Sequence, residues 1–119
     1  MDRSASGDRS RVALGRWGEE RVARWYVDAG YAVLDRNWYG GAGELDLVLG
    51  RDAQVIFCEV KTRASDRFGA PVEAVDGRKQ RRIRSLAVEW LRHHGRAGDI
   101  RFDVAAVLGG RVTVIQGAF

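Results

Sequence analysis

The sequence of 119 residues contains one cysteine, one proline and no long hydrophobic run. A single cysteine, Cys58, cannot form a disulfide within the chain, which favours a reducing compartment. No run approaches the roughly 18 apolar residues that a membrane-spanning helix needs. The first residues are polar and lack the apolar centre of a signal peptide. These absences predict a cytoplasmic protein without a membrane segment.

Lysine is also scarce. Arginine supplies all but two of the 20 cationic side chains, and the two lysines are Lys61 and Lys79. Lysine offers a compact and strongly hydrated point charge, whereas arginine offers a planar fork. A lysine at the end of Glu59-Val60-Lys61 is therefore a hint that this position needs an ammonium group.

Positive charge is concentrated in one part of the chain. The net charge is +4, and eight cations oppose three anions between Asp76 and Arg101. Such a field suits a polyanion such as DNA. The alternative is that this stretch is only the solvated face of a helix. The candidates for nucleic-acid contacts are Arg63, Arg78, Lys79 and Arg82.

The length predicts one domain, over residues 10–119, after a flexible polar tail at residues 1–9. Apolar spacing predicts a helix over 10–29, which Ser10 begins and Gly30 ends. Leu14, Trp17 and Trp25 are expected on its apolar face, and we expect both tryptophans in the core.

The remaining residues predict strands and a second helix. Alternation and turn residues predict strands at 31–35, 44–49, 54–62, 100–108 and 111–116. Loops are expected at 37–43 and 63–70, and a second helix from Pro71 to about His94, with a break near Gly77 left open. The order α-β-β-β-α-β-β predicts a single-domain α/β fold, in which helices flank a mixed sheet.

Four polar residues occupy matching positions in two neighbouring strands. Residues i and i+2 share a face of a strand, so Glu44 lies beside Asp46, and Glu59 beside Lys61. A four-residue turn at 50–53 would pair Glu44 with Glu59. A register shifted by a bulge would bring Asp46 opposite Glu59 instead. Either way, carboxylates and one ammonium group converge.

Like charges that face each other across two strands destabilise the pairing, and a divalent cation removes this conflict. Carboxylate ligands without thiolate or imidazole select Mg²⁺ or Mn²⁺. Such an ion suits phosphodiester hydrolysis, in which Lys61 would stabilise the developing negative charge. The alternative is a pair of exposed ion pairs. The acidic strand, the tight turn, Glu-Val-Lys and the basic helix together favour a nuclease.

Two segments resemble the core of PD-(D/E)xK nucleases: Gly43-Glu44-Leu45-Asp46-Leu47-Val48 and Val55 to Arg63. More closely, the chain resembles the YraN family, small bacterial proteins regarded as endonucleases and related to archaeal Holliday-junction resolvases. The likeness extends from about Leu14 to Val107. It includes Gly15-Arg16-Trp17-Gly18-Glu19, Gly30-Tyr31, Arg36-Asn37, Phe68-Gly69-Ala70-Pro71, Lys79 and Arg101-Phe102-Asp103-Val104.

The resemblance implies a restriction-endonuclease-like fold and a substrate of structured or branched DNA. It implies that Asp46, Glu59 and Glu19 bind the metal and that Lys61 is catalytic, with Glu44 as a further acidic candidate. The sequence departs from the resolvase-like pattern, because the residue before Asp46 is not proline. A junction has two symmetric strands to cut, so the same hypothesis favours a homodimer.

Two aromatic residues and two other functions complete the sequence-based hypotheses. Trp38 and Tyr39 are candidates to stack on an unpaired base, although the anchoring of a loop is favoured for both. The chain could instead be a nucleic-acid-binding or adaptor module without chemistry, in DNA repair, recombination or uptake. It could also be a subunit whose basic surface meets an acidic protein.

Overall fold

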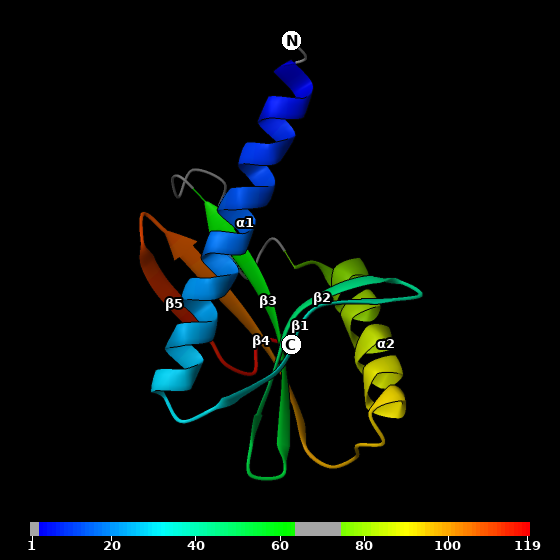
Figure 1. Ribbon diagram of the computed structural model, residues 1–119. Helices are drawn as coiled ribbons and strands as arrows, with labels where there is room; N and C mark the ends of the chain where they lie inside the picture. Colours follow the sequence, from blue (N-terminus) through cyan, green and yellow to red (C-terminus); the bar gives the residue numbers. More distant parts are fainter. Residues whose placement is uncertain (1–2, 64–74) are drawn as a thin grey trace.

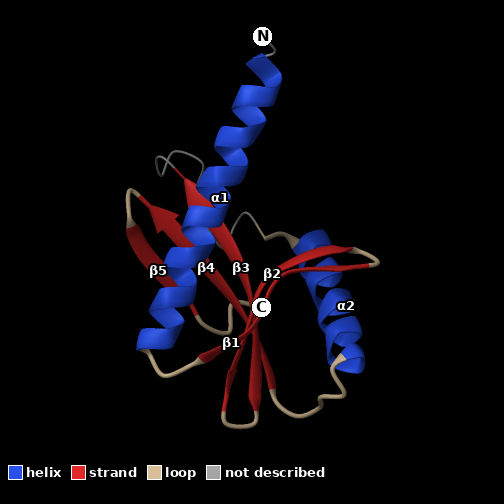
Figure 2. Cartoon of the chain, viewed as in Figure 1, coloured by secondary structure: helices blue, strands red, loops and turns tan. Residues whose placement is uncertain are grey.

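The computed structural model describes residues 3–63 and 75–119, with side chains from residue 10 onward. The elements are α1 (Arg3–Asp28), β1 (Ala32–Gly40), β2 (Gly43–Arg51), β3 (Gln54–Arg63), α2 (Gly77–His93), β4 (Ile100–Leu108) and β5 (Arg111–Ile115). This confirms the predicted order (Figures 1 and 2). Within the described ranges, neither helix is long and apolar enough to span a membrane.

The sheet is mixed, and its strands follow the order β1-β2-β3-β4-β5. β3 and β4 are parallel, joined through α2, and the other neighbouring pairs are antiparallel. Side chains alternate between two core clusters. Phe57 packs in one cluster with Trp90 of α2, and Ile56 packs in the other with Tyr26 of α1. The predicted mixed sheet with a helix on each face is confirmed.

Helix α1 begins at Arg3, so the predicted start of the helix at Ser10 is wrong, while the flexibility of residues 1–9 stays a prediction. Residues 3–28 contain no proline, the residue that most strongly interrupts a helix. The N-terminal part of α1 extends beyond the sheet (Figure 1). Leu14 and Trp17 are consequently 43% and 45% exposed, so the predicted core position of Trp17 is wrong.

Helix α2 begins at Gly77, where the side chain of Asp76 accepts a hydrogen bond of 3.0 Å from the Lys79 amide. The predicted break at Gly77 is therefore the start of the helix. The expected start at Pro71 and most of the loop before it lie outside the described residues. The predicted apolar stripe is confirmed, because Ile83, Leu86, Ala87 and Trp90 are buried.

The predicted loop at 37–43 is mostly strand. β1 continues to Gly40 and pairs with β2, with Tyr39 across from Glu44 and Gly40 across from Gly43. Turn-forming residues suggested a loop, but pairing along the whole hairpin outweighs the local preference. The correction matters because it places residues 37–39 beside the acidic strand.

The connection between β2 and β3 is shorter than predicted. Arg51 pairs with Gln54, which leaves only Asp52 and Ala53 in the turn. The register then runs without a shift to Leu47 across from Cys58. The alternative that pairs Glu44 with Glu59 does not fit this register and is wrong, and no strand pair extends to Asp46.

The buried carboxylate of Asp103 belongs to the fold. It accepts hydrogen bonds from the Tyr26 hydroxyl at 2.6 Å, the Gly117 amide at 3.0 Å and the Arg101 guanidinium at 2.8 and 2.9 Å. A buried charge with this many donors is well compensated. Asp103 therefore has a structural role in the fold.

Candidate metal and nucleic-acid site

Three carboxylates from two elements meet at one place. Glu19 of α1 and Glu44 and Asp46 of β2 each offer one oxygen, and these oxygens lie within 4.8 Å of one another. All three residues are half-buried. The structure thus brings together two of the three predicted metal ligands and the additional acidic candidate, Glu44.

A glycine allows α1 to bring Glu19 to this place. A Cβ atom added to Gly18 would overlap the Thr62 hydroxyl and lie 3.0 Å from the Thr62 Cβ. The helix therefore approaches β3 closely at Gly18. Thr62, the residue that it meets there, follows Lys61 in the chain. Helix residue 19 follows directly and reaches the strand that carries the other two carboxylates.

Asp46 lies where β2 leaves β3. The paired residues of the two strands end at Leu47 and Cys58. Beyond them, Asp46 Oδ2 accepts a hydrogen bond of 2.9 Å from the Val60 amide. The side chain thus accepts the hydrogen bond that a backbone carbonyl would accept if the strand pair continued. This bond holds the carboxylate where the two strands separate.

Asn37 links the other two carboxylates. Its Nδ2 donates to Glu19 Oε1 at 3.0 Å and to Glu44 Oε1 at 2.7 Å. The sequence showed Asn37 only as part of the family likeness and suggested no role for it. Its backbone φ of +47° lies in the left-handed region, which asparagine tolerates better than most residues, and only the structure shows this angle.

Glu59 and Lys61 form a separate pair on β3. Lys61 Nζ lies 3.4 Å from Glu59 Oε1, and Glu59 is only 9% exposed. Glu59 is not one of the three clustered carboxylates, so the structure places it on the ammonium group of Lys61. Its role as a metal ligand stays a prediction.

The carboxylates disturb one another's ionisation. Burial raises the pKa of Asp46 to about 8, and the charges of Glu59, Glu19 and Glu44 add to this effect. Burial also raises the pKa of Glu19, although the hydrogen bond from Asn37 opposes the rise. Without a bound cation, Asp46 and Glu19 therefore retain their protons to a higher pH than exposed carboxyl groups do.

The donor set fits a hard divalent cation. An octahedral Mg²⁺ binds oxygens at about 2.1 Å, so its ligands are separated by up to about 4.2 Å. The three oxygens, within 4.8 Å of one another, need only small side-chain rotations to reach that spacing. Carboxylates alone, without sulfur or imidazole, favour Mg²⁺ or Mn²⁺ over zinc.

A hollow of about 230 Å³ opens beside the cluster. It is lined by Val12, Gly15, Arg16, Glu19, Asn37, Tyr39 and Glu44. Tyr39 is 71% exposed, and the neighbouring Glu44 carboxylate raises the pKa of its hydroxyl. The hollow thus joins a cation and an exposed aromatic ring to the acidic cluster, a combination that suits a nucleotide.

Trp38 has a different environment from Tyr39. Its ring packs at the edge of the core beneath α2, with ring centroids 5.7 Å from His93 and 6.4 Å from His94. The favoured interpretation as an anchor is confirmed for Trp38, although the segment it anchors is a strand. A contact of Trp38 with nucleic acid stays a prediction.

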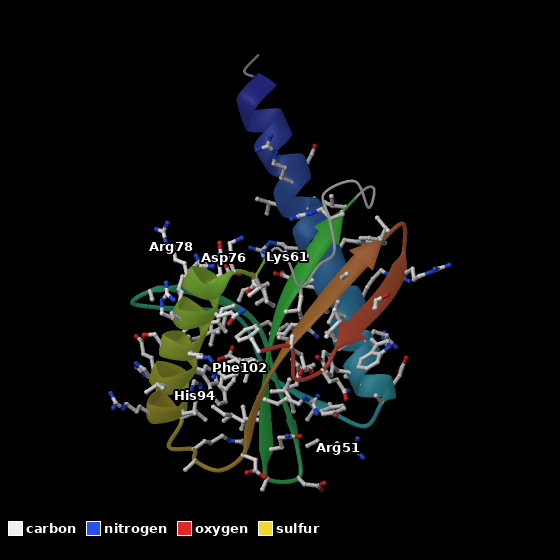
Figure 3. All side chains as sticks on the ribbon, turned by 180° about the vertical axis from the view of Figure 1, so that it is seen from behind. Arg51, Lys61, Asp76, Arg78, His94 and Phe102 are labelled. Carbon is white, nitrogen blue, oxygen red and sulfur yellow. The ribbon has the colours of Figure 1, made fainter. Side chains whose placement is uncertain are left out.

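The predicted phosphate-binding residues are distributed around the same end of the molecule. Figure 3 shows Arg78 at the start of α2 and Lys61 toward that end. Arg82 is exposed, and its Cδ is 3.8 Å from a Cβ built on Gly43, the residue before Glu44. Arg63 is exposed at the end of β3.

Not every cation of α2 is available for a ligand. The guanidinium of Arg84 lies 4.8 Å from the centre of the Phe102 ring and 5.6 Å from that of Phe119. This cation–π packing gives Arg84 a structural role. The basic surface is therefore smaller than the count of cations in the sequence suggests.

The chain is similar to proteins of one family. The model of a family described as "Uncharacterised protein family UPF0102" matches residues 18–107. The chain belongs to this family. A UPF0102 protein of Frankia alni is 51% identical over 93% of this chain and 98% of its own length. A relative from Moorella thermoacetica is 45% identical over 92% of this chain and 98% of its own length. A relative from Rhodococcus jostii is 49% identical over 83% of this chain and 85% of its own length.

The part of the chain that matches the UPF0102 model contains every member of the acidic cluster. It also contains Asn37, Glu59 and Lys61, and it extends through α2 to β4. The predicted likeness to a family of small bacterial proteins is confirmed at the level of UPF0102.

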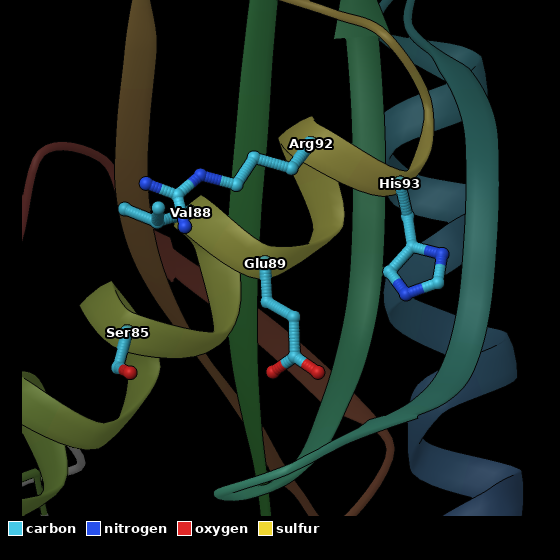
Figure 4. Close-up of a pocket in the computed structure, with 5 residues that line it drawn as sticks. All are labelled: Ser85, Val88, Glu89, Arg92 and His93. Carbon is cyan, nitrogen blue, oxygen red and sulfur yellow. The ribbon is translucent and has the colours of Figure 1, made fainter.

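A second hollow on this UPF0102 protein is lined by residues of α2. It measures about 610 Å³ against the outer side of α2 and is lined by Ser85, Val88, Glu89, Arg92 and His93 (Figure 4). The Glu89 carboxylate accepts hydrogen bonds of 3.0 and 3.1 Å from the Gly41 amide. Glu89 therefore ties the β1–β2 turn to α2.

Proposed function

We propose that this UPF0102 protein is a metal-dependent endonuclease that hydrolyses phosphodiester bonds of DNA. The observation that carries the proposal is the meeting of Glu19, Glu44 and Asp46, with oxygens within 4.8 Å of one another. Glu59 lies near enough to Asp46 for its charge to raise the pKa of Asp46, and it pairs with Lys61. An acidic cluster next to an ammonium group is the arrangement that such hydrolysis needs.

Glu19, Glu44 and Asp46 would hold Mg²⁺ or Mn²⁺. The ion, when bound, supplies a Lewis acid that polarises the phosphoryl group and acidifies a water molecule. Lys61 provides a positive charge for the oxygen that becomes more negative during hydrolysis. Glu59 orients the Lys61 ammonium group through their 3.4 Å contact.

The cations near this end of the molecule provide a path for the DNA backbone. Arg78, Lys79 and Arg82 lie on the first turns of α2, and Arg16 lies in the hollow on the α1 side. Arginine and lysine bind phosphates and steer a polyanion toward the acidic cluster, which would repel it without them. The exposed ring of Tyr39 is placed to stack on a base next to the cut.

The substrate class follows from the resemblance to junction resolvases. Structured or branched DNA exposes unpaired or unstacked bases at the branch, and the hollow beside Tyr39 suits such a base. We therefore propose branched DNA as the preferred substrate, ahead of continuous duplex.

A binding module without chemistry explains the basic residues and not the acidic cluster. Three carboxylates beside a phosphate-binding surface repel the ligand unless a cation lies between them. This repulsion favours the nuclease over the adaptor.

The proposal is tested with labelled four-way junction, flap, single-stranded and duplex DNA, each with Mg²⁺, Mn²⁺ or EDTA. Asp46→Asn keeps an oxygen that accepts from Val60 and removes the charge. Asp28→Asn, at the exposed end of α1, is the matched control. We expect metal-dependent cleavage by the wild type and by the control, strongest on branched DNA, and none by Asp46→Asn.

Two outcomes would count against the nuclease. Cleavage that Asp46→Asn retains would show that the activity does not belong to this site. Salt-sensitive DNA binding with no cleavage under any metal condition would favour the adaptor module.

A further inference from the structure

Asn37 of β1 contacts a carboxylate of α1 and a carboxylate of β2 within the acidic cluster. One amide nitrogen donates to Glu19 Oε1 at 3.0 Å and to Glu44 Oε1 at 2.7 Å. An asparagine amide carries two N–H donors, so each carboxylate receives its own hydrogen. Both acceptors are carboxylates, and hydrogen bonds to charged acceptors are stronger than those between neutral groups.

The Asn37 amide donates hydrogen bonds to both carboxylates without adding a positive charge. Two carboxylates on separate elements repel each other and would move apart in the absence of a metal. An arginine or lysine would hold them together, but its charge would compete with a metal ion for the same oxygens. The Asn37 amide holds them together and leaves their charge for the metal.

Asn37 is the only non-glycine residue of β1 with a positive backbone φ. The register places residue 37 across from Asp46, between the pairs Arg36–Leu47 and Trp38–Leu45. Its φ of +47° lies in the left-handed region, which β-branched and bulky residues avoid. This conformation turns the side chain toward both α1 and β2, where an ordinary strand residue would alternate with its neighbours.

We infer that Asn37 is a positioning residue that holds Glu19 and Glu44 at ligand spacing before the metal binds. The inference rests on the proposed metal site and goes beyond it, since it assigns a residue that donates no ligand. Residues that orient metal ligands contribute strongly to metal affinity, and their loss costs about 10- to 100-fold.

The test measures Mn²⁺ binding by isothermal titration calorimetry, without DNA. Asn37→Gly keeps the left-handed backbone and removes the amide. Asp52→Gly is the matched control, because Asp52 is the other non-glycine residue with positive φ in the described chain and lies in the β2–β3 turn. We expect about 10-fold weaker Mn²⁺ binding by Asn37→Gly and unchanged binding by Asp52→Gly.

The outcomes separate this inference from the proposed function. If the wild type and Asn37→Gly bind Mn²⁺ equally well, Asn37 is merely structural and the inference is overturned, while the proposed metal site stands. If the wild type binds no Mn²⁺, both are overturned. Asn37→Ser keeps one donor and serves if the glycine variant does not fold. It should bind Mn²⁺ more weakly than the wild type, and unchanged binding would again overturn the inference.

Discussion

At the scale of single residues, Asp46 combines opposing requirements. Its Oδ2 accepts the Val60 amide hydrogen at 2.9 Å, which favours the charged form. Burial and the neighbouring carboxylates favour the neutral form more strongly and raise its pKa to about 8. A bound divalent cation would reverse that balance. The same residue therefore connects metal binding with the pH dependence of stability.

The first prediction concerns stability without metal. An exposed aspartate has a pKa of about 3.9, and the folded state raises that of Asp46 to about 8. The folded chain thus retains a proton that the unfolded chain releases. This stabilising contribution is full below pH of about 4 and is lost as the pH rises toward about 8. In EDTA, the free energy of unfolding of the wild type should therefore fall relative to that of Asp46→Asn across this window.

The measurement is urea denaturation of both proteins at several pH values. The difference between pH 5 and 8.5 should reach at least about 1.4 kcal/mol, which corresponds to one pKa unit. Mg²⁺ added at pH 8.5 should restore the loss in the wild type and not in Asp46→Asn. Parallel pH profiles for the two proteins would contradict the raised pKa.

The second prediction concerns Lys61. Lys61→Ala should lower the rate of metal-dependent cleavage by about 100-fold or more, because it removes charge that stabilises the transition state. Mn²⁺ binding should persist, since the ammonium group binds no metal. Single-turnover cleavage and Mn²⁺ titration measure the two effects. A variant that cleaves at the wild-type rate would remove Lys61 from the reaction.

At the scale of elements, the placement of α1 determines whether Glu19 reaches the cluster. Gly18 meets Thr62 without room for a Cβ atom, whereas a Cβ on Gly15 would meet nothing within 4 Å. The two glycines lie three positions apart on one helix and differ mainly in this respect. They offer a matched pair of substitutions.

The third prediction uses this pair. Gly18→Ala should lower the free energy of unfolding by about 1–3 kcal/mol, as overpacking does, and should weaken Mn²⁺ binding because α1 moves away from β3. Gly15→Ala should raise stability by about 0.5–1 kcal/mol through helix propensity. Urea denaturation and Mn²⁺ titration decide, and equal effects of the two substitutions would show that the close approach at Gly18 is unimportant.

Sequence patterns predicted the elements whose signal is local. The stripe from Ile83 to Trp90 repeats at helical spacing, and the alternation in β3 is regular, so both could be predicted without the fold. The extent of β1 could not, because its turn-forming residues are held in a strand by pairing with β2. Trp17 was misplaced because spacing along a helix does not show where the helix leaves the body of the protein.

The candidate site was predictable to a similar degree. Asp46, Glu59 and Lys61 share strand faces by simple alternation, and Glu19 entered through the family likeness. The grouping of Glu44 and Asp46 with Glu19, apart from Glu59, depends on how α1 and β2 are placed in the fold. The role of Asn37 depends on a backbone angle. Neither feature has a signature in one sequence.

At the scale of the whole molecule, the acidic cluster and the cations lie toward one end. A net charge of +4 favours association with a polyanion, as the proposed nuclease requires. Arg84 departs from this surface because it packs over Phe102 and Phe119. The division between available and packed cations gives a further prediction.

The fourth prediction concerns salt. The logarithm of DNA affinity should fall linearly with the logarithm of salt concentration. Lys79→Ala and Arg82→Ala should each reduce that slope by about 1, the effect of one lost phosphate contact. Arg84→Ala, on the same helix, should leave the slope unchanged. Fluorescence anisotropy with Asp46→Asn as background avoids cleavage, and equal slopes for all three would contradict the proposed DNA path.

The most direct test of the central claim is anomalous diffraction from crystals grown with Mn²⁺. A metal site at the cluster predicts one strong anomalous peak about 2.1 Å from oxygens of Glu19, Glu44 and Asp46. The same crystals would show whether Glu59 also contributes a ligand. A well-defined cluster without a peak at saturating Mn²⁺, or a peak bound only elsewhere, would contradict the account.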